Sequence, residues 1–407
     1  MQWHKFFSDP QLTSLIDLAL KENLDLKIAL TRMDAARAQA KAARASLLPT
    51  VSGNAQASGT RAGKWVAGDG SSSYSAGLEA TWEIDLWGKL RSEKGAALDR
   101  LLASAQARRV VQSNLIADLA TAYYELKALD TTLGVLDRNE RLQQTAVDSV
   151  RAQLEAGQVT KLAVEQFEAH LKNIRSLRLE TQSQILESEA VVNTLCGTGV
   201  RKVPRSSVPI DQARIPQLSL RVPSKYVEYR PDVRQAEFEL SASRADVQAA
   251  RAAFYPDVTI DGLLGLQAFH ASKLFDARSA AGSIAGSLAA PLINRGALKA
   301  QYEQAGAAEL EALYTYHQTL LNGYVEVHNQ VAKGRVLERL ESMKTSESDL
   351  LNQSVNTSMD LFNSGRATYL ELLAARETAL DAEIEKIDIR KRQFQTAVGL
   401  YKALGGG

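Results

Sequence analysis

Cysteine is nearly absent from this sequence, since Cys196 is the only one in 407 residues. A single cysteine excludes an internal disulfide framework and any zinc site built from cysteines. The five histidines are scattered, with no histidine four residues away and no cysteine nearby, so they form no metal-binding pattern. We therefore expect no bound metal and no cofactor.

Neither an excess of charge nor a long hydrophobic run is present. With 48 Lys and Arg against 47 Asp and Glu, the net charge of +1 gives no electrostatic basis for binding nucleic acid. The longest stretches without an ionisable residue, 45–60 and 279–294, have 16 residues each, too few for a helix that spans a bilayer. Phosphate-binding glycine loops, Gly-x-Ser-x-Gly and supported acid–base pairs are also missing, so we expect no enzymatic activity.

Proline is scarce and unevenly placed. Five of the nine prolines lie between Pro204 and Pro231, and none lies in 50–203 or 292–407. Because proline interrupts both helices and sheet ladders, the crowded stretch predicts an irregular connector over 204–231.

Similar landmarks occur on both sides of this connector. An Ala-Ala-Arg-Ala motif ahead of Pro49 recurs ahead of Pro256, and a Gly-x-x-Thr motif at Gly157 recurs at Gly365. The shared offset of about 207 residues indicates an internal duplication. The predicted organisation is a first repeat over 1–203, the connector over 204–231 and a second repeat over 232–407.

Within each repeat the spacing of apolar residues changes in the same order. Helical spacing in 12–46 and 232–254 is followed by the alternation of apolar and polar residues that is typical of strands. Long stretches without proline then carry apolar residues three and four apart, and the helix from Lys89 to Leu154 would reach roughly 100 Å, as in a coiled coil. The predicted elements are β-hairpins over 51–86 and 258–292 and long helical hairpins over 89–195 and 297–402.

Four strands in one chain leave the fold open at this point. The alternation places Glu79, Glu83, Asp85 and Asp261 on a charged face opposite a partly apolar one. Membrane barrels show such a pattern around a polar lumen, but they need at least eight strands. The residues alone are therefore compatible with an oligomeric barrel continued by a helical tube, or with a soluble coiled-coil scaffold.

Several motifs, in order along nearly the whole chain, carry a family resemblance. They are Trp-x-x-Phe-Phe at 3–7, Trp-Glu-Ile-Asp-Leu-Trp-Gly at 82–88, Arg-Pro-Asp-Val at 230–233 and Ala-Leu-Gly-Gly at 403–406. This set resembles the TolC-like outer-membrane factors, and within them the NodT-type branch. The resemblance implies a mixed α/β membrane protein, mainly α, in which a homotrimer closes one twelve-stranded β-barrel, four strands from each chain. A long α-helical coiled-coil tunnel continues the barrel.

The resemblance also implies a location and partners. The barrel would lie in outer-membrane lipid of a Gram-negative bacterium, and the tunnel would project into the periplasm. There it would meet a periplasmic adaptor (membrane fusion protein) and an inner-membrane efflux pump. The implied function is a passive exit duct of a tripartite pump for drugs, metals or other small solutes. A type I protein-secretion duct remains an alternative, because a wide tunnel has few selective contacts.

Two sets of functional residues follow from the resemblance. The turns at the tunnel's far end would contact the adaptor, and they comprise Glu155, Ala156, Gly157, Gln158, Val159, Thr160, Asn363, Ser364, Gly365, Arg366, Ala367 and Thr368. The implied aperture residues are Glu371, Arg366 and Tyr369; a further acidic position of relatives, one turn later, is Ala374 here. Three copies of Glu371 around an axis would attract cations.

The residues themselves predict a simpler role for these turns. Gly157 and Gly365 suit the left-handed conformation that ends a helix, while Thr160 and Thr368 suit the N-caps of the returning helices. Relatives in the NodT-type branch carry a signal peptide and a lipidated cysteine ahead of the Trp3 segment. Neither is in the printed sequence, so we expect a shortened form, with Cys196 packed as a small apolar residue.

Overall fold

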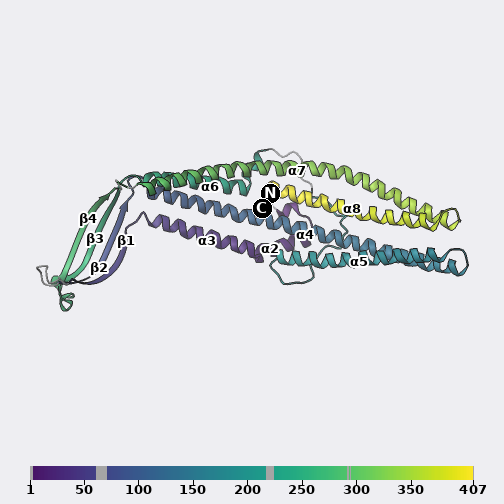
Figure 1. Ribbon diagram of the computed structural model, residues 1–407, viewed down its shortest axis with the longest axis horizontal. Coiled ribbons are helices and arrows are strands. Elements are labelled where there is room, and N and C mark those ends of the chain that lie inside the picture. Colours follow the sequence, from purple (N-terminus) through teal and green to yellow (C-terminus); the bar gives the residue numbers. More distant parts are fainter. Residues whose placement is uncertain (1–2, 61–70, 217–223, 291–292, 294, 407) are drawn as a thin grey trace. The chain divides into compact units, whose positions relative to one another are not determined.

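The computed structural model describes residues 3–60, 71–216, 224–290, 293 and 295–406 (Figure 1). The chain is mainly helical and carries one four-stranded sheet, as predicted. The helices are α1 (Trp3–Phe6), α2 (Pro10–Glu22), α3 (Leu24–Ala45), α4 (Lys89–Glu155), α5 (Lys161–Leu195), α6 (Pro231–Ala252), α7 (Gly296–Asn363) and α8 (Tyr369–Ala403). The strands are β1 (Thr50–Thr60), β2 (Ser71–Ile84), β3 (Asp257–Ala268) and β4 (Ala280–Ala289), and the short 3-10 helices are η1 (Ser224–Tyr229), η2 (Ala271–Lys273) and η3 (Ala277–Ser279).

The chain forms two compact units. Unit 1 comprises Met1–Ala29, Arg108–Val233 and Leu320–Gly407, and unit 2 comprises Leu30–Ala107 and Arg234–Thr319. Each unit takes segments from both predicted repeats, and the duplication itself stays a prediction. Part of the predicted connector, 217–223, and the predicted end of the second hairpin at Leu292 lie outside the described residues.

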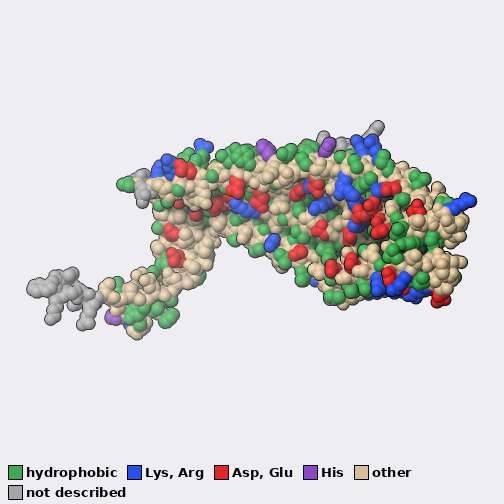
Figure 2. Space-filling view, turned by 45° about the vertical axis from the view of Figure 1, so that its right-hand side comes forward, with side chains coloured by type: hydrophobic (Ala, Val, Ile, Leu, Met, Phe, Trp, Pro, Cys, Tyr) green, Lys and Arg blue, Asp and Glu red, His purple; other side chains and the backbone are tan. Residues whose placement is uncertain are grey.

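The sheet of unit 2 is antiparallel in the order β1-β2-β3-β4 (Figure 1). Its register brings Leu78 opposite Leu264 and Trp82 opposite Ile260, and these residues share one apolar face with Ile284 of β4. That face is open: Leu264 is 72% and Ile284 86% exposed. In Figure 2 the visible side of the sheet carries few charged side chains, whereas Lys, Arg, Asp and Glu are interspersed over the helices.

Two glycines allow an unusually close approach within the sheet. Gly77 of β2 lies directly opposite Gly265 of β3. A Cβ at Gly77 would come within 2.7 Å of the Leu264 carbonyl oxygen, and a Cβ at Gly265 within 2.5 Å of the Ala76 carbonyl oxygen. Backbone atoms cannot move aside as a flexible side chain can, so glycine is required at both positions for this strand pairing.

The hydrophobic core of unit 1 lies where α1 and α2 pack on α4, α5 and α8. Phe7, Ile16, Tyr123 and Tyr401 are almost completely buried there, and each such side chain contributes about 1.5–3 kcal/mol of transfer free energy. Cys196 is buried in the same core, as predicted. Within the described segments, none of the helices combines the length and the apolar character needed to cross a membrane.

One predicted helix is divided. The stretch 12–46 forms α2 and α3, which are separated at Asn23. The Asn23 side chain accepts a hydrogen bond from the Leu26 amide (2.9 Å) and donates one to the Leu195 carbonyl oxygen (2.9 Å). Asparagine competes for backbone groups in this way, so it ends one helix, begins the next and ties both to the end of α5.

Candidate functional site

Three of the four predicted lumen acids share one face of the sheet. Glu79 and Glu83 lie on β2, and Asp261 of β3 lies opposite Thr81, between them in register. Their face is therefore the one opposite Leu78 and Trp82. Glu79 and Asp261 make no ion pair with any described residue. No described cation therefore neutralises these two acids on this face.

Glu83 and Asp85, unlike Glu79 and Asp261, are engaged in local contacts. Glu83 pairs with Lys89, with 3.0 Å between Oε1 and Nζ. Asp85 follows the end of β2 and accepts hydrogen bonds from the Leu90 amide (3.1 Å) and the Arg91 amide (3.0 Å), so it caps the first turn of α4. Burial alone would raise the pKa of Asp85, but the hydrogen bonds from Arg91 and Leu90 hold it below its usual value.

The turns that end α4 and α7 have the same backbone geometry. Gly157 and Gly365 both have φ of +69°, as expected for residues that terminate a helix in the left-handed conformation. In the first turn Gly157 N donates to Leu154 O (2.9 Å), and in the second Gly365 N donates to Phe362 O (3.0 Å). A Cβ at either glycine would meet no described atom within 4 Å, so both turns present open surface.

The helices that follow these turns begin differently. Thr160 and Thr368 are both N-cap residues, as predicted, but only the Thr368 side chain caps its helix. Glu371 completes a capping box, because its Oε2 accepts hydrogen bonds from Thr368 N (2.6 Å) and Thr368 Oγ1 (2.9 Å). These hydrogen bonds hold the pKa of Glu371 below its usual value, so its carboxylate stays charged to a lower pH than that of a free glutamate.

The three predicted aperture residues differ in their surroundings. Glu371 is exposed, while Tyr369 packs with Leu372 against an apolar cluster formed by α4, α5 and α8, in which Phe167 is 1% exposed. Arg366 lies in the exposed turn, where its amide donates to the Leu361 carbonyl oxygen (2.8 Å). Their role in an aperture stays a prediction, as does the contact of the two turns with an adaptor.

A polar contact across the helical hairpins was missed by the sequence analysis. Gln143 of α4 donates to the Phe167 carbonyl oxygen (3.1 Å) and accepts from Arg376 of α8 (3.3 Å). Burial lowers the pKa of Arg376 and of the adjacent His170 on α5. No sequence motif marks these residues, because the contact joins side chains and backbone from three separate helices, α4, α5 and α8.

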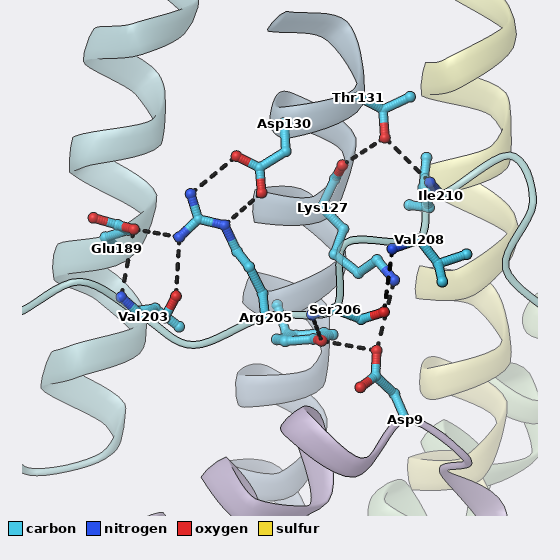
Figure 3. Close-up of polar contacts among 11 residues, drawn as sticks. Asp9, Lys127, Asp130, Thr131, Glu189, Val203, Arg205, Ser206, Val208 and Ile210 are labelled. Carbon is cyan, nitrogen blue, oxygen red and sulfur yellow. Dashed lines mark hydrogen bonds and ion pairs between the residues drawn. The ribbon is translucent and has the colours of Figure 1, made fainter. Parts of the chain in front are cut away.

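The start of the connector is held against α4 and α5 by the ion pairs of Arg205 (Figure 3). The Arg205 guanidinium pairs with both carboxylate oxygens of Asp130 on α4 and with Glu189 on α5. Nearby, Asp9 caps α2 and accepts a hydrogen bond from Tyr123 Oη (2.7 Å), while Lys127 Nζ lies 3.6 Å from it. Proline alone predicts irregular backbone here, but these side chains hold that backbone in one place.

Two motifs behind the family resemblance contact each other. Arg230 donates to the Ala403 carbonyl oxygen (2.9 Å) and pairs with Asp232 (2.8 Å) and with Glu326 of α7 (2.9 Å). Gly405 has φ of +75° and leaves room beside the Arg230 backbone. The Arg-Pro-Asp-Val and Ala-Leu-Gly-Gly motifs therefore form one contact, which holds the C-terminal end of α8 in place.

Comparisons with known proteins agree with this architecture. The family model "Outer membrane efflux protein" matches residues 15–198 and 222–406. The chain is 31% identical to the pyoverdine export outer membrane protein OpmQ of Pseudomonas aeruginosa, over 100% of this chain and 87% of that protein. It is 27% identical to the cation efflux system protein CusC of Escherichia coli, over 100% and 88%.

Solved structures of outer-membrane channels also match this chain over its whole length. The crystal structure of CusC superposes with a TM-score of 0.94 at 26% identity, over 100% of this chain and 95% of that one. The open state of the MtrE outer membrane channel of Neisseria gonorrhoeae gives a TM-score of 0.89 at 27% identity, over 100% and 92%. Together with the two-faced sheet and the long helical hairpins, these matches show that the chain belongs to the outer membrane efflux protein family and is an efflux protein of the Gram-negative outer membrane.

Proposed function

We propose that three copies of this chain close one twelve-stranded barrel in the outer membrane and form a passive exit duct. A periplasmic adaptor and an inner-membrane pump would deliver the cargo and supply the energy. In this proposal the chain performs no catalytic step.

The observation that carries this proposal is the two-faced sheet with its two unpaired edges. β1 and β4 each pair on one side only among the described strands, and the apolar face of the sheet is exposed. In a membrane every strand edge must be paired, so the sheet has to be continued by other copies of itself. Two copies would give a barrel of eight strands, and side chains fill the interior of a barrel of that size. Three copies give a barrel of twelve strands, which leaves space for a lumen.

The helices of unit 1 support a ring of copies. On α7, Val336, Met343 and Leu350 are exposed by 62%, 71% and 63% and recur every seven residues, which is the spacing of a coiled-coil seam. On α5, Leu179 and Leu186 are 62% and 68% exposed. Two different apolar stripes on one chain suit head-to-tail contacts, which close a ring when the rotation allows it.

The charges support conduction rather than specific binding. Glu79 and Asp261 are left on the polar face of the sheet, where three copies would give a ring of acids along a water-filled lumen. Relatives of similar identity are named for pyoverdine export, cation efflux and toluene efflux, which favours small solutes over proteins as cargo. We infer that the pump and the adaptor choose among such solutes.

The absolute mass of the membrane-extracted protein tests the assembly. Light scattering in detergent, corrected for bound detergent, should give a protein mass near three times 44.3 kDa. The same preparation should form conducting pores in a planar bilayer. A monomer or dimer that stays soluble without detergent would contradict the duct and favour a coiled-coil scaffold.

A further inference from the structure

The segment between β3 and β4, residues 269–279, holds two phenylalanine side chains in solvent. Phe269 is 73% and Phe275 83% exposed. The backbone around them is nevertheless fixed by its own hydrogen bonds: Asp276 N donates to the Lys273 carbonyl oxygen (3.1 Å), and Ser279 Oγ donates to the same oxygen (2.7 Å). An ordered segment that presents two large apolar rings is typical of a surface that another molecule covers.

The same segment, here called the aromatic loop, carries unneutralised positive charge. Lys273 and Arg278 are exposed and make no ion pair with any described residue. The single acid of the loop, Asp276, accepts a hydrogen bond from the Arg278 amide (3.0 Å) and so caps η3. Aromatic rings beside free cations match a boundary between apolar chains and anionic headgroups.

Aromatic residues also mark both ends of the apolar face of the sheet. At the end nearer the helices, Trp82 donates to the Leu47 carbonyl oxygen (3.1 Å) and Trp87 to the Pro256 carbonyl oxygen (2.8 Å). At the other end, Tyr74 pairs with Ala268, the last residue before the aromatic loop. In Figure 2, hydrophobic side chains gather at that end of the sheet. Aromatic girdles on both sides of an apolar band are the pattern of membrane barrels.

The apolar face between these two aromatic ends is shorter than that band, although β2 itself has 14 residues. The eight residue steps from Trp82 to Tyr74 on β2 span roughly 26 Å along the strand at about 3.3 Å per residue. With a strand tilt of about 40°, this covers about 20 Å of membrane depth, less than the band of about 25 Å. Beyond Tyr74, β2 continues with Ser73, Ser72 and Ser71, so the exposed aromatic side chains in the described loop at that end are Phe269 and Phe275.

We propose that the aromatic loop is embedded in the outer leaflet of the membrane. Phe269 and Phe275 lie at the boundary between headgroups and acyl chains, and Lys273 and Arg278 bind lipid phosphates. The partner is a phosphate-bearing, anionic lipid surface. This inference rests on the proposed duct, because it requires the sheet to cross the membrane.

Spin labels on the reconstituted trimer test the depth of the loop. Cys196 is 1% exposed, so Cys196→Ala gives a background without cysteine, into which Phe275→Cys, Ile284→Cys or Gln158→Cys is introduced singly. For each label we measure its accessibility to oxygen, which partitions into lipid, and its accessibility to a nickel chelate, which stays in water. In phosphatidylcholine vesicles that contain bisphosphorylated lipid A, the label at Ile284 should be accessible mainly to oxygen. The label at Gln158 should be accessible mainly to the nickel chelate. The Phe275 label should resemble Ile284, at a shallower depth.

The three positions separate failure of the loop from failure of the duct. A Phe275 label that meets nickel as freely as Gln158, while Ile284 stays in lipid, overturns the loop and leaves the duct standing. A Phe275 label that meets neither reagent places the ring against protein, in the lumen or against a second copy, and also overturns the loop. Labels at both Ile284 and Phe275 that meet nickel overturn the duct itself.

The cations are tested by the lipid. Lipid A should lower nickel access at Phe275 at least twofold relative to phosphatidylcholine alone, because its phosphates hold the loop down. The double variant Lys273→Gln/Arg278→Gln should lose this dependence, while Lys161→Gln, an exposed lysine on α5, should keep it. An equal effect of lipid A on the double variant contradicts the role of the two cations.

Discussion

At the scale of single residues, Glu371 combines a structural role with a proposed role in the aperture. Its carboxylate completes the capping box with Thr368, and yet the residue is exposed at the start of α8. In the structure of one chain, an ordinary exposed surface residue and a residue of an aperture ring would look the same. What distinguishes them is the effect of its charge on ions in the assembled protein.

We predict that Glu371→Gln reduces the cation selectivity of the channel. Glutamine keeps the capping box but removes the charge, so three negative charges near the axis are lost without disturbing the helix start. The reversal potential in a planar bilayer under a salt gradient measures this change. Glu155→Gln, at the end of the other hairpin, is the matched control and should leave the reversal potential unchanged. An unchanged value for Glu371→Gln removes the residue from the aperture.

At the scale of elements, the two helical turns are alike in backbone and open at their surfaces. Both glycines have φ of +69°, and a Cβ at either would contact nothing within 4 Å. A substitution there therefore meets strain in the backbone and not a clash. This allows the role of the turn as a structure to be separated from its role as a contact surface.

We predict that Gly365→Lys abolishes efflux in cells while trimer yield and bilayer conductance persist. The lysine projects from the surface proposed to meet the adaptor, whereas the left-handed backbone costs about 1–2 kcal/mol, which a long helical hairpin tolerates. Gly365→Asn separates the two effects, because asparagine accepts this backbone and is small. Loss of the trimer in both variants would show that the turn is purely structural.

At the scale of the whole molecule, the exposed apolar stripes support the proposed association of several copies. Met343 is 71% exposed at the centre of the α7 seam. A carboxylate buried there between copies would be unpaired and would cost several kcal/mol. We predict that Met343→Glu lowers the ratio of trimer to monomer in the detergent-extracted protein by tenfold or more.

Light scattering measures this shift, with Met343→Leu as the control that keeps the apolar contact. A trimer of unchanged mass in Met343→Glu would place the seam away from the subunit contact. The edge strands β1 and β4 would then have to provide the association by themselves.

The sequence by itself determined the elements and their kind. Alternation of apolar and polar residues fixes which face of a strand each side chain occupies, and absence of proline permits helices such as α4 and α7 to continue for 67 and 68 residues. These are local effects of the backbone, so a pattern along the chain reveals them. The four strands, the long helices and the left-handed turns at Gly157 and Gly365 were predictable for this reason.

Only the tertiary structure decided which distant residues meet. Asp85 had the period of a lumen acid, yet it caps α4, and Asn23 divides a helix whose apolar spacing is continuous. Arg205 and Arg230 join segments more than 70 residues apart, and Gly77 faces Gly265 across a strand pair. Such contacts depend on how packed elements bring donors, acceptors and backbones together in space. That arrangement leaves no periodic trace in the sequence.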